Sequence, residues 1–439
     1  MMKVIYATDA SVYRELPLAV AIPKNKADLT KLINFANTHH TSLIPRAAGT
    51  SLAGQIVGNG IVVDISKHFN QILEFNEAEK WVRVQPGVVR DELNLFLKTH
   101  GLFFSPITST ANRAMIGGMV GNNSCGTTSI VYGSTREHVL ELKTLLSDGS
   151  EVTFEQLSKS DFQKKTKLQT LEGELYRHIK TELDEPKNKE NIRTNFPKKT
   201  IHRRNTGYAL DYLLETELFS EEEKAFDFCK LLCGSEGTLA FTTEIKLHLD
   251  AVQKPVDVIA AVHFENIDES LRGTQLAMKY KPTQCELIDK IILDCTKENI
   301  NQNKNRWFIE GDPEGLLMIE FRENTLEEAM AKAEAMIAEL KANNMGYAFP
   351  IISPENTKKL RELRKAGLGL LANIPGDKKS VACIEDTAVD LDDLADYIKD
   401  VEVLMAGFGQ KQVVYAHAGA GELHLRPILN LKESKDVEQ

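Results

Sequence analysis

The chain has 439 residues, a net charge of −10 at pH 7 and 42% hydrophobic residues. This length and apolar content predict two or three domains with cores of their own and exclude a fibrous or disordered chain. The acidic balance disfavours nucleic acid as a partner. No run approaches the roughly 18 apolar residues of a membrane span, and MMKVIYATDA has no signal-peptide core. We therefore expect a cytoplasmic protein.

The first predicted elements, at residues 17–70, are apolar strands alternating with the amphipathic helix KADLTKLINFANTH. This order is a βαβ-like start. One of its strands runs into the loop PRAAGTSLAGQ at residues 45–55, where Gly49 and Gly54 allow positive φ and close backbone approach. Thr50 and Ser51 add hydroxyl and N–H donors, so the loop is suited to bind a phosphate. A plain surface turn is the alternative.

Two familiar nucleotide motifs are excluded. Gly54 is followed by Gln55 and not by Lys-Ser/Thr, which removes the P-loop NTPases. The closest match to a Rossmann fingerprint, residues 367–372, follows the charged helical segment KKLRELRKA and not a strand, so it is interpreted as a helix end.

Further along, residues 80–104 give strand WVRVQPG and helix VVRDELNLFLKTHG, which precede a second glycine-rich block at 106–133. Its glycines let backbone pack against a flat ring, while its amides and hydroxyls reach the polar edge of that ring. The strands that follow are joined by a predicted hairpin turn at Asp148-Gly149. The polar stretch at 155–200 is predicted to be a solvated helical insertion, and GSEGTLAFTTEIKL at 234–247 is a small-residue turn feeding a strand.

After residue 250, strands PVDVIAAVHF and GLLMIEF alternate with helices SLRGTQLAMKY and TLEEAMAKAEAMIAELKANN, which indicates a second α+β domain. Near the end, VVYAHAGAGELHLRP contains His417 and His424. Gly419 and Gly421 permit a turn that makes the two imidazoles converge, and converging imidazoles suit Zn²⁺ or a related divalent ion. Unrelated core histidines are the alternative.

Four ordered blocks, PRAAGTSLAGQ, the 106–133 region, GSEGTLAFTTEIKL and HAGAGELH, resemble the flavin-dependent oxidases and dehydrogenases of the vanillyl-alcohol oxidase type. The closest likeness is to the D-lactate, glycolate and D-2-hydroxyglutarate dehydrogenases. The resemblance implies an α+β fold, with a two-subdomain PCMH-type FAD-binding domain at 1–250. It implies that an α+β substrate (cap) domain with an antiparallel sheet follows at 251–439, and that the active site lies at the interface.

The resemblance also implies that FAD is the cofactor. The residues expected to bind it are Pro45, Arg46, Gly49, Thr50, Ser51, Leu52, Gly54, Gln55, Pro106, Thr108, Ile116, Gly117, Gly118, Gly121, Asn122, Ser124, Gly126, Tyr132, Gly133, Glu236, Gly237 and Thr238. Some family members attach FAD through a histidine in the first loop, but residues 45–55 contain none. We therefore expect non-covalent FAD.

By the same resemblance, His417 and His424 are the expected metal ligands, with Zn²⁺ or another divalent ion, and they belong to the catalytic set. A metal on the hydroxyl and carboxylate of a 2-hydroxy acid lowers the alcohol pKa and orients C2–H toward flavin N5. The neighbouring pair Glu385-Asp386 is given no catalytic role.

A carboxylate substrate also needs a cation, and Arg364 matches the arginine that the family places ahead of the substrate site. Lys378 or Lys379 is expected to supplement it. The alternative is that Arg361, Arg364 and Lys365 form the wet face of a helix.

The chain departs from the family in one respect. Family members continue past HAGAGELH to a Glu-His-Gly segment with a further metal ligand and base, whereas this chain ends at LKESKDVEQ. We therefore expect either a fragment truncated in the cap domain or a protein in which those functions come from elsewhere. YATDASVYR at residues 6–14 resembles the large bacterial members fused to an iron–sulfur part.

The six cysteines are scattered and include no CxxC pair, whereas an iron–sulfur cluster normally needs a closely spaced set of thiolates. Electrons from FAD are therefore expected to leave for an iron–sulfur domain or subunit or another external acceptor. Peripheral membrane association stays open.

The sequence therefore predicts an FAD-dependent dehydrogenase that oxidises a D-2-hydroxy acid, such as lactate or 2-hydroxyglutarate, to the 2-oxo acid. Two other classes stay open. One is an FAD oxidase that uses oxygen and acts on a non-acid alcohol or a sugar. The other is a non-catalytic flavin subunit of an electron-transfer complex.

Overall fold

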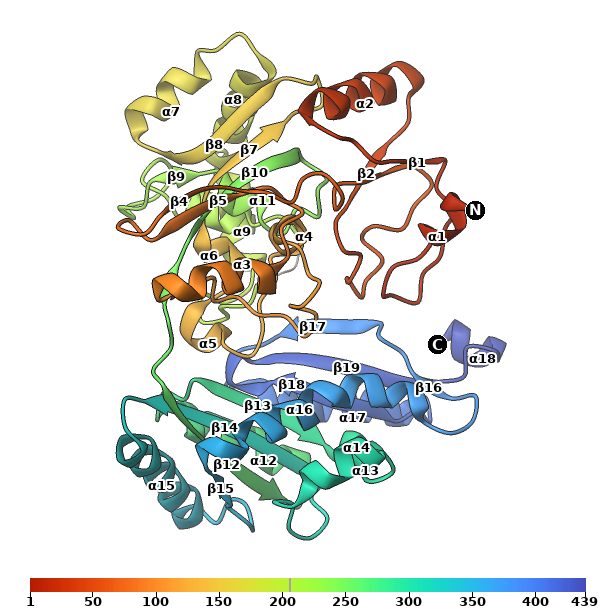
Figure 1. Cartoon of the computed structure of the whole chain (residues 1–439), viewed down its shortest axis with the longest axis vertical. Coiled ribbons are helices and arrows are strands. Elements are labelled where there is room, and N and C mark those ends of the chain that lie inside the picture. The colour runs from red at the N-terminus through yellow and green to blue at the C-terminus, as the bar shows by residue number, and fades with distance from the viewer. Residues whose placement is uncertain (205–206) are drawn as a thin grey trace. The chain divides into compact units, whose positions relative to one another are not determined.

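The computed structural model describes residues 1–204 and 207–439, and the chain divides into two compact units (Figure 1). Unit 1 comprises residues 1–126, 133–197 and 204–252. Unit 2 comprises residues 127–132, 198–203 and 253–439. Each unit has buried apolar cores of its own.

Unit 1 begins with helix α1 (Met2–Ile5) and a three-stranded parallel sheet in the order β1-β3-β2. The strands and their connecting helix are β1 (Ala19–Ala21), α2 (Lys26–His39), β2 (Leu43–Arg46) and β3 (Ile61–Asp64). Asn25 caps α2 by accepting the N–H of Asp28, and Leu29 and Ile33, one turn apart, are buried in the core. The predicted βαβ-like start is confirmed.

A six-stranded antiparallel sheet in the order β4-β5-β10-β7-β8-β9 forms the centre of unit 1. Its strands are β4 (Ile72–Asn76), β5 (Trp81–Val84), β7 (Val139–Leu145), β8 (Glu151–Leu157), β9 (Phe226–Asp227) and β10 (Phe241–His248). The turn between β7 and β8 contains Gly149 at φ 81°, as the Asp148-Gly149 pair predicted. Shorter elements are α3 (Arg90–Leu97), β6 (Leu102–Phe103), α4 (Ile116–Asn122), α6 (Thr135–His138), α10 (Leu210–Leu214), α11 (Cys229–Leu232) and β11 (Asp250–Ala251).

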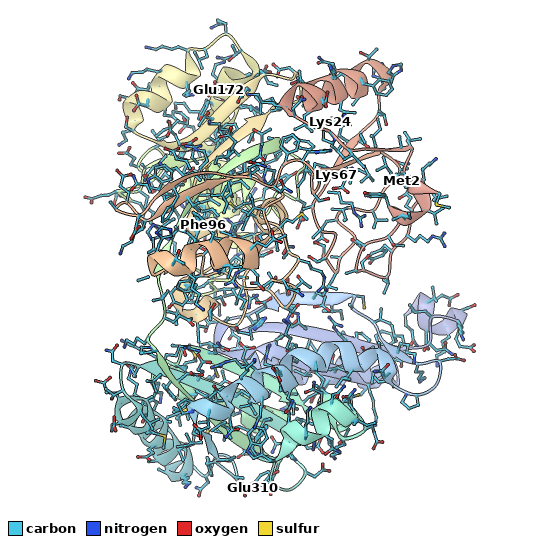
Figure 2. All side chains as sticks on the ribbon, in the orientation of Figure 1. Met2, Lys24, Lys67, Phe96, Glu172 and Glu310 are labelled. Carbon is cyan, nitrogen blue, oxygen red and sulfur yellow. The ribbon has the colours of Figure 1, made fainter. Side chains whose placement is uncertain are left out.

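The polar stretch at residues 155–200 contains the helices α7 (Lys159–Thr166), α8 (Leu171–Asp184) and α9 (Pro186–Asn195). Charged side chains such as Glu172, which pairs with Lys165 at 2.5 Å, lie on these helices (Figure 2). Phe162 and Tyr176, however, are each 1% exposed, and the Phe162 ring packs 4.8 Å from that of Phe226 in β9. The stretch is therefore part of the core of unit 1 and not only a solvated insertion.

Unit 2 is built on one sheet in the order β15-β12-β14-β13-β18-β19-β16, with β17 also paired to β19. Its strands are β12 (Val256–Phe264), β13 (Gln284–Asp289), β14 (Gly315–Glu323), β15 (Ile351–Ile352), β16 (Lys379–Ser380), β17 (Ile384–Ala388), β18 (Gln412–His417) and β19 (Glu422–Leu429). All of these pairings are antiparallel, which confirms the predicted antiparallel sheet.

Because side chains alternate along a strand, this sheet has two different faces. One face is apolar, and its residues, such as Val258, Leu317 and Val414, pack under three helices. These helices are α12 (Ile267–Met278), α15 (Leu326–Ala342) and α17 (Leu394–Gly407).

The opposite face packs Ile288, Leu316 and Tyr415 against α13 (Lys290–Lys297) and α16 (Pro354–Leu370). This face is called the polar face here, because it also carries charged and imidazole groups. These are Asp257, Glu320, Glu286, His417, Glu422, His424 and Arg426. The remaining helices of unit 2 are α5 (Ser129–Tyr132), α14 (Ile300–Asn303) and α18 (Ser434–Glu438).

The segment at residues 367–372 lies at the end of α16, as predicted. Within the described part of the chain, no helix combines the length and apolar character needed to cross a membrane.

Candidate functional site

Three glycine-containing segments of unit 1 meet in the structure: the loop at 45–55, helix α4 and the turn before β10. A Cβ placed on Gly118 of α4 would lie 3.3 Å from the Cβ of Ala47. A Cβ on Gly237, in the turn, would lie 3.1 Å from Cγ of Pro45. The structure therefore brings together the three blocks that the sequence separates widely.

The loop at 45–55 depends on glycine at two positions. Gly49 has φ 68° and Gly54 has φ 78°, values in the left-handed region that favours glycine. A Cβ on Gly49 would also lie 2.7 Å from Nη2 of Arg46, and one on Gly54 would lie 2.7 Å from the ring of Tyr13. The predicted positive φ angles are confirmed.

The glycines of the second block have different neighbours. A Cβ on Gly117 would lie 2.4 Å from Cβ of Pro86, and one on Gly126 would lie 2.0 Å from the carbonyl oxygen of Ile107. These two glycines are required by the packing of the protein itself. A Cβ on Gly121 would meet nothing closer than 3.8 Å, so an added methyl group fits there.

Polar side chains line the same place. The Glu236 N–H donates to the carbonyl of Gly121 at 2.9 Å, and the Glu236 carboxyl is hydrogen-bonded to Asn122 and to Nε2 of Gln55 at 3.5 Å. Burial raises the pKa of Glu236 to about 7, against the opposing effect of these amides. Oε1 of Gln55 is buried without a hydrogen-bond partner among the described residues. The glycine-lined approach and this unmatched acceptor fit a flat ligand with a polar edge, as FAD is.

Other residues predicted to contact the cofactor differ in their surroundings. Ile116 is 0% exposed and belongs to the core, and the Pro106 carbonyl accepts the Nε–H of Arg90 at 3.0 Å. Tyr132 lies in the segment that packs with unit 2. The rest of the predicted set lies on unit 1, namely Thr50, Ser51, Leu52, Thr108, Ser124, Gly133 and Thr238.

On unit 2, Arg364 of α16 points onto the polar face of the sheet. It is 8% exposed, it forms an ion pair with Glu286 of β13, and its guanidinium lies 4.4 Å from the centre of the Tyr415 ring. Its Nη2 atom lies 3.4 Å from Nδ1 of His417. Arg364 therefore does not belong to a solvent-exposed face of the helix, which was the alternative interpretation.

His417 and His424 lie beside each other, with ring centroids 5.4 Å apart. The turn between β18 and β19 makes this possible, with Gly421 at φ 66°. The predicted convergence of the two imidazoles is confirmed. Nδ1 of His417 lies 2.8 Å from Oε2 of Glu286, and Nδ1 of His424 lies 2.7 Å from Oε2 of Glu385.

Glu385 and Asp386, to which the sequence analysis gave no role, lie next to His424. Asp386 Oδ1 is 3.3 Å from its Nδ1, and Arg426 pairs with the other oxygen of Glu385 at 2.8 Å. Glu385, Asp386 and His424 each offer a ligand atom within 4.8 Å of the others. This chemistry, imidazole with carboxylates, fits Zn²⁺ or a similar divalent ion.

Burial and charge act oppositely on the two imidazoles. Burial, together with the nearby cations Arg203 and Arg364, lowers the pKa of His417 well below its usual value. Burial also disfavours the charged form of His424, but its hydrogen bonds to Asp386 and Glu385 outweigh this and raise its pKa. A neutral imidazole, such as His417, keeps a lone pair for a metal.

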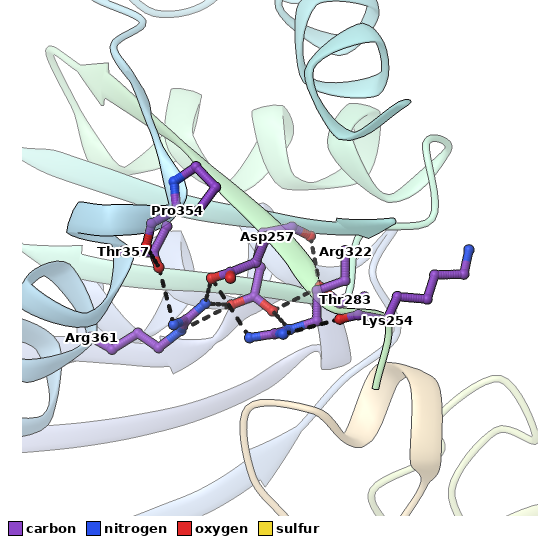
Figure 3. Close-up of polar contacts among 8 residues, drawn as sticks. Lys254, Asp257, Thr283, Arg322, Pro354, Thr357 and Arg361 are labelled. Carbon is purple, nitrogen blue, oxygen red and sulfur yellow. Dashed lines mark hydrogen bonds and ion pairs between the residues drawn. The ribbon is translucent and has the colours of Figure 1, made fainter. Parts of the chain in front are cut away.

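Three further ion pairs lie on the polar face. Arg203, from the short segment 198–203, pairs with Glu422 of β19. Arg361, one turn before Arg364 on α16, pairs with Asp257 and Glu320 (Figure 3). The ion pairs of Arg361 join α16 to β12 and β14.

The two predicted lysines lie elsewhere in unit 2. Lys378 and Lys379 are exposed, and Nζ of Lys379 donates to the carbonyl of Ile374 at 2.5 Å. The structure does not bring them to Arg364. Sequence reasoning missed Glu286 altogether, although a charged residue between the apolar residues Cys285 and Leu287 is a signal that could have found it.

Two family models match this chain. The FAD binding domain matches residues 17–155, and the C-terminal domain of FAD linked oxidases matches residues 253–439. The chain belongs to the FAD-linked oxidases. Residues 17–155 therefore form an FAD-binding domain, and FAD is the cofactor.

Named relatives of this FAD-linked oxidase include two D-2-hydroxyglutarate dehydrogenases. That of Pseudomonas putida is 35% identical over 98% of this chain and 43% of its own length, and that of Escherichia coli is 34% identical over 97% and 42%. The chain thus spans less than half the length of these curated relatives. Glycolate oxidase subunit GlcD of Bacillus subtilis is 25% identical over 100% of this chain and 79% of its own length.

Solved structures share the fold. A p-cresol methylhydroxylase with substrate bound superposes with a TM-score of 0.66 at 10% identity, covering 100% of this chain and 80% of that one. An alkyldihydroxyacetonephosphate synthase gives 0.61 at 14% identity, covering 93% and 70%. The predicted PCMH-type α+β fold is confirmed.

Proposed function

We propose that this member of the FAD-linked oxidase family acts as a dehydrogenase of D-2-hydroxy acids, with 2-hydroxyglutarate as the first candidate substrate. The observation that carries the proposal is the buried cluster on the polar face of unit 2. There the cation Arg364 lies 3.4 Å from one of two imidazoles whose ring centroids are 5.4 Å apart. Relatives named for this activity, 34–35% identical over nearly the whole chain, support the choice of substrate.

Each group of a 2-hydroxy acid has a matching residue in this cluster. Arg364 would bind the carboxylate, because a guanidinium grips two oxygens at once. His417 and His424 would hold a divalent ion, and Glu385 and Asp386 orient His424 through its Nδ1 atom. When bound, such an ion lowers the pKa of the substrate hydroxyl, and FAD takes up the hydride from C2.

The protein residues supply positioning and exclude water. Arg364, Glu286 and His417 are each largely buried, so charges among them act more strongly than in water. Because Lys378 and Lys379 are exposed and lie away from Arg364, we assign the carboxylate to Arg364 alone. We expect FAD to be non-covalent, since the loop at 45–55 has no histidine.

We further propose that the electrons leave for an external acceptor, an iron–sulfur domain or subunit being the first candidate. In the described residues, the only group of three or more His, Cys, Asp or Glu ligand atoms spaced for a metal is Glu385, Asp386 and His424. Cys229 and Cys233 are buried, and burial raises the pKa of both thiols. This part of the chain offers no thiolate set for an iron–sulfur cluster.

A chelator separates this proposal from an oxygen-using oxidase. The yellow protein, with an artificial electron acceptor, should oxidise D-2-hydroxyglutarate or D-lactate, stall after treatment with a chelator, and recover on addition of Zn²⁺ or Mn²⁺. Turnover of a non-acid alcohol at a rate unchanged by the chelator would contradict the proposal.

A further inference from the structure

We propose that Glu286 is a positioning residue that sets the tautomer of His417 and engages the neighbouring guanidinium of Arg364, so that His417 presents Nε2 to a divalent ion. The inference rests on the proposed function in one respect, the use of a divalent ion at His417. It assigns a role to a residue that neither binds substrate nor coordinates the ion.

Glu286 is placed for this role by the sheet. Its side chain is 2% exposed and belongs to the polar face, between the apolar Ile288 and the end of β13. Leu287 pairs with Ala416 across β13 and β18, so the preceding residue on β13 faces the following residue on β18, His417. A carboxylate this deeply buried needs a charged or hydrogen-bonding partner, and Glu286 has two.

The first partner fixes where the imidazole carries its proton. Oε2 and Oε1 of Glu286 lie 2.8 and 3.1 Å from Nδ1 of His417. The ion pair with Arg364 holds Glu286 as a hydrogen-bond acceptor, so Nδ1 of His417 carries the hydrogen of this contact and Nε2 keeps its lone pair. Among the described residues Nε2 of His417 has no hydrogen-bond partner. Metal-binding histidines usually donate their other N–H in this way.

The second partner explains why the carboxylate is needed. Nη2 of Arg364 lies 3.4 Å from the same Nδ1 atom, and Nε of Arg364 is buried without a partner among the described residues. The ion pair with Glu286 occupies this guanidinium. Without it, Arg364 is the remaining neighbour able to donate to Nδ1. The proton would then move to Nε2, and the lone pair needed by the ion would be lost.

The neighbouring strand repeats the arrangement. On β19, Arg426 pairs with Glu385 at 2.8 Å, and Glu385 accepts from Nδ1 of His424 at 2.7 Å. Both imidazoles are therefore bound at Nδ1 by a carboxylate that is itself paired with an arginine. Two independent arginine–glutamate–histidine sets, each leaving Nε2, favour a positioning role over a chance buried ion pair.

Zn²⁺ affinity of the FAD-loaded protein, measured by competition with a chromophoric chelator, tests the inference without any turnover. Glu286→Gln should bind Zn²⁺ roughly 10- to 100-fold more weakly than wild type. The matched control is Glu320→Gln, which removes an equally buried carboxylate on the same face, paired with Arg361 of the same helix. It should stay within about twofold of wild type. Equal Zn²⁺ affinity in Glu286→Gln and wild type, or equal loss in both variants, would overturn the inference.

A second pair of variants keeps the test decisive if Glu286→Gln does not fold. Glu286→Asp retains the charge for Arg364 but shortens the reach to Nδ1, so Zn²⁺ affinity should fall while Glu320→Asp leaves it unchanged. Adding Arg364→Met to Glu286→Gln removes the competing donor and should restore much of the Zn²⁺ affinity. A double variant no better than the single variant would contradict the competition between Arg364 and Glu286.

The outcome separates this inference from the proposed function. If the wild-type protein binds Zn²⁺ but no D-2-hydroxy acid reduces its flavin, the proposed substrate class is wrong. The comparison of Zn²⁺ affinity between Glu286→Gln and wild type remains valid. Wild-type protein that binds no divalent ion would overturn the role of Glu286.

Discussion

The glycine-lined segments of unit 1 and the polar face of unit 2 are built in opposite ways. The first is made by backbone, with Gly118 against Ala47 and Gly237 against Pro45, so its information lies in short runs of sequence. The second is made by side chains from different strands and a helix, with Glu286, Arg364 and His417 meeting from distant parts of the chain. Short sequence motifs therefore specify the first region. For the second region they specify individual residues but not which of these residues meet.

The largest expected effect follows from the glycines of unit 1. Gly126→Ala would place a methyl group 2.0 Å from the carbonyl of Ile107 and should destabilise unit 1 by about 1–3 kcal/mol or more. Gly121→Ala meets nothing within 3.8 Å of its methyl group, so it should fold normally. If FAD lies against Gly121, as predicted, this variant should instead lose bound flavin. Thermal unfolding and the flavin-to-protein absorbance ratio measure the two effects, and a Gly121→Ala protein that retains full FAD would remove Gly121 from the cofactor site.

The next effect concerns the arginines of α16. Arg364→Lys keeps the charge but loses the two-pronged grip, so KM for a D-2-hydroxy acid should rise roughly 10- to 100-fold. Arg361→Lys, one turn away in the network of Figure 3, should lower stability and leave KM unchanged. Steady-state kinetics of both variants decide between them. The same rise in KM in both would show that Arg364 acts through the placement of α16 alone.

The smallest effect is a pH dependence of stability from Asp289. Burial raises the pKa of this carboxyl from 3.8 to about 7, although it accepts N–H groups from Ile292 and Val414 at 3.0 and 2.8 Å. Because the folded pKa lies above the unfolded one, this contribution to stability is complete below the unfolded pKa and is lost as pH rises through about 7. Asp289→Asn should therefore flatten the fall in unfolding temperature across this window.

Asp312→Asn is the matched control for that experiment. Hydrogen bonds from Lys290 and Lys297 lower the pKa of Asp312 to about 2, so its contribution is present above the unfolded pKa and is lost only in acid. Its removal should leave the neutral window unchanged. An Asp289→Asn protein with the wild-type slope would contradict a buried, protonated Asp289.

The sequence predicts the backbone-built region of unit 1 better than the side-chain cluster of unit 2. The positive φ angles of Gly49 and Gly54, the parallel start, the antiparallel sheet and the convergence of His417 and His424 were all predicted, because turn and strand chemistry is local. Glu286 was not found, because its function comes from partners on another strand and a helix. Nothing in their own neighbourhood of sequence revealed that Glu385 and Asp386 contact His424.

In the proposed reaction, a D-2-hydroxy acid delivers its C2 hydride to the FAD of this chain. The most direct test is anaerobic mixing of the oxidised yellow protein, loaded with Zn²⁺, with D-2-hydroxyglutarate and, separately, with its L-enantiomer, following the flavin absorbance. The flavin should bleach with the D-acid, more slowly when C2 carries deuterium, and should not bleach with the L-acid. Flavin that stays oxidised with every D-2-hydroxy acid offered would rule this reaction out.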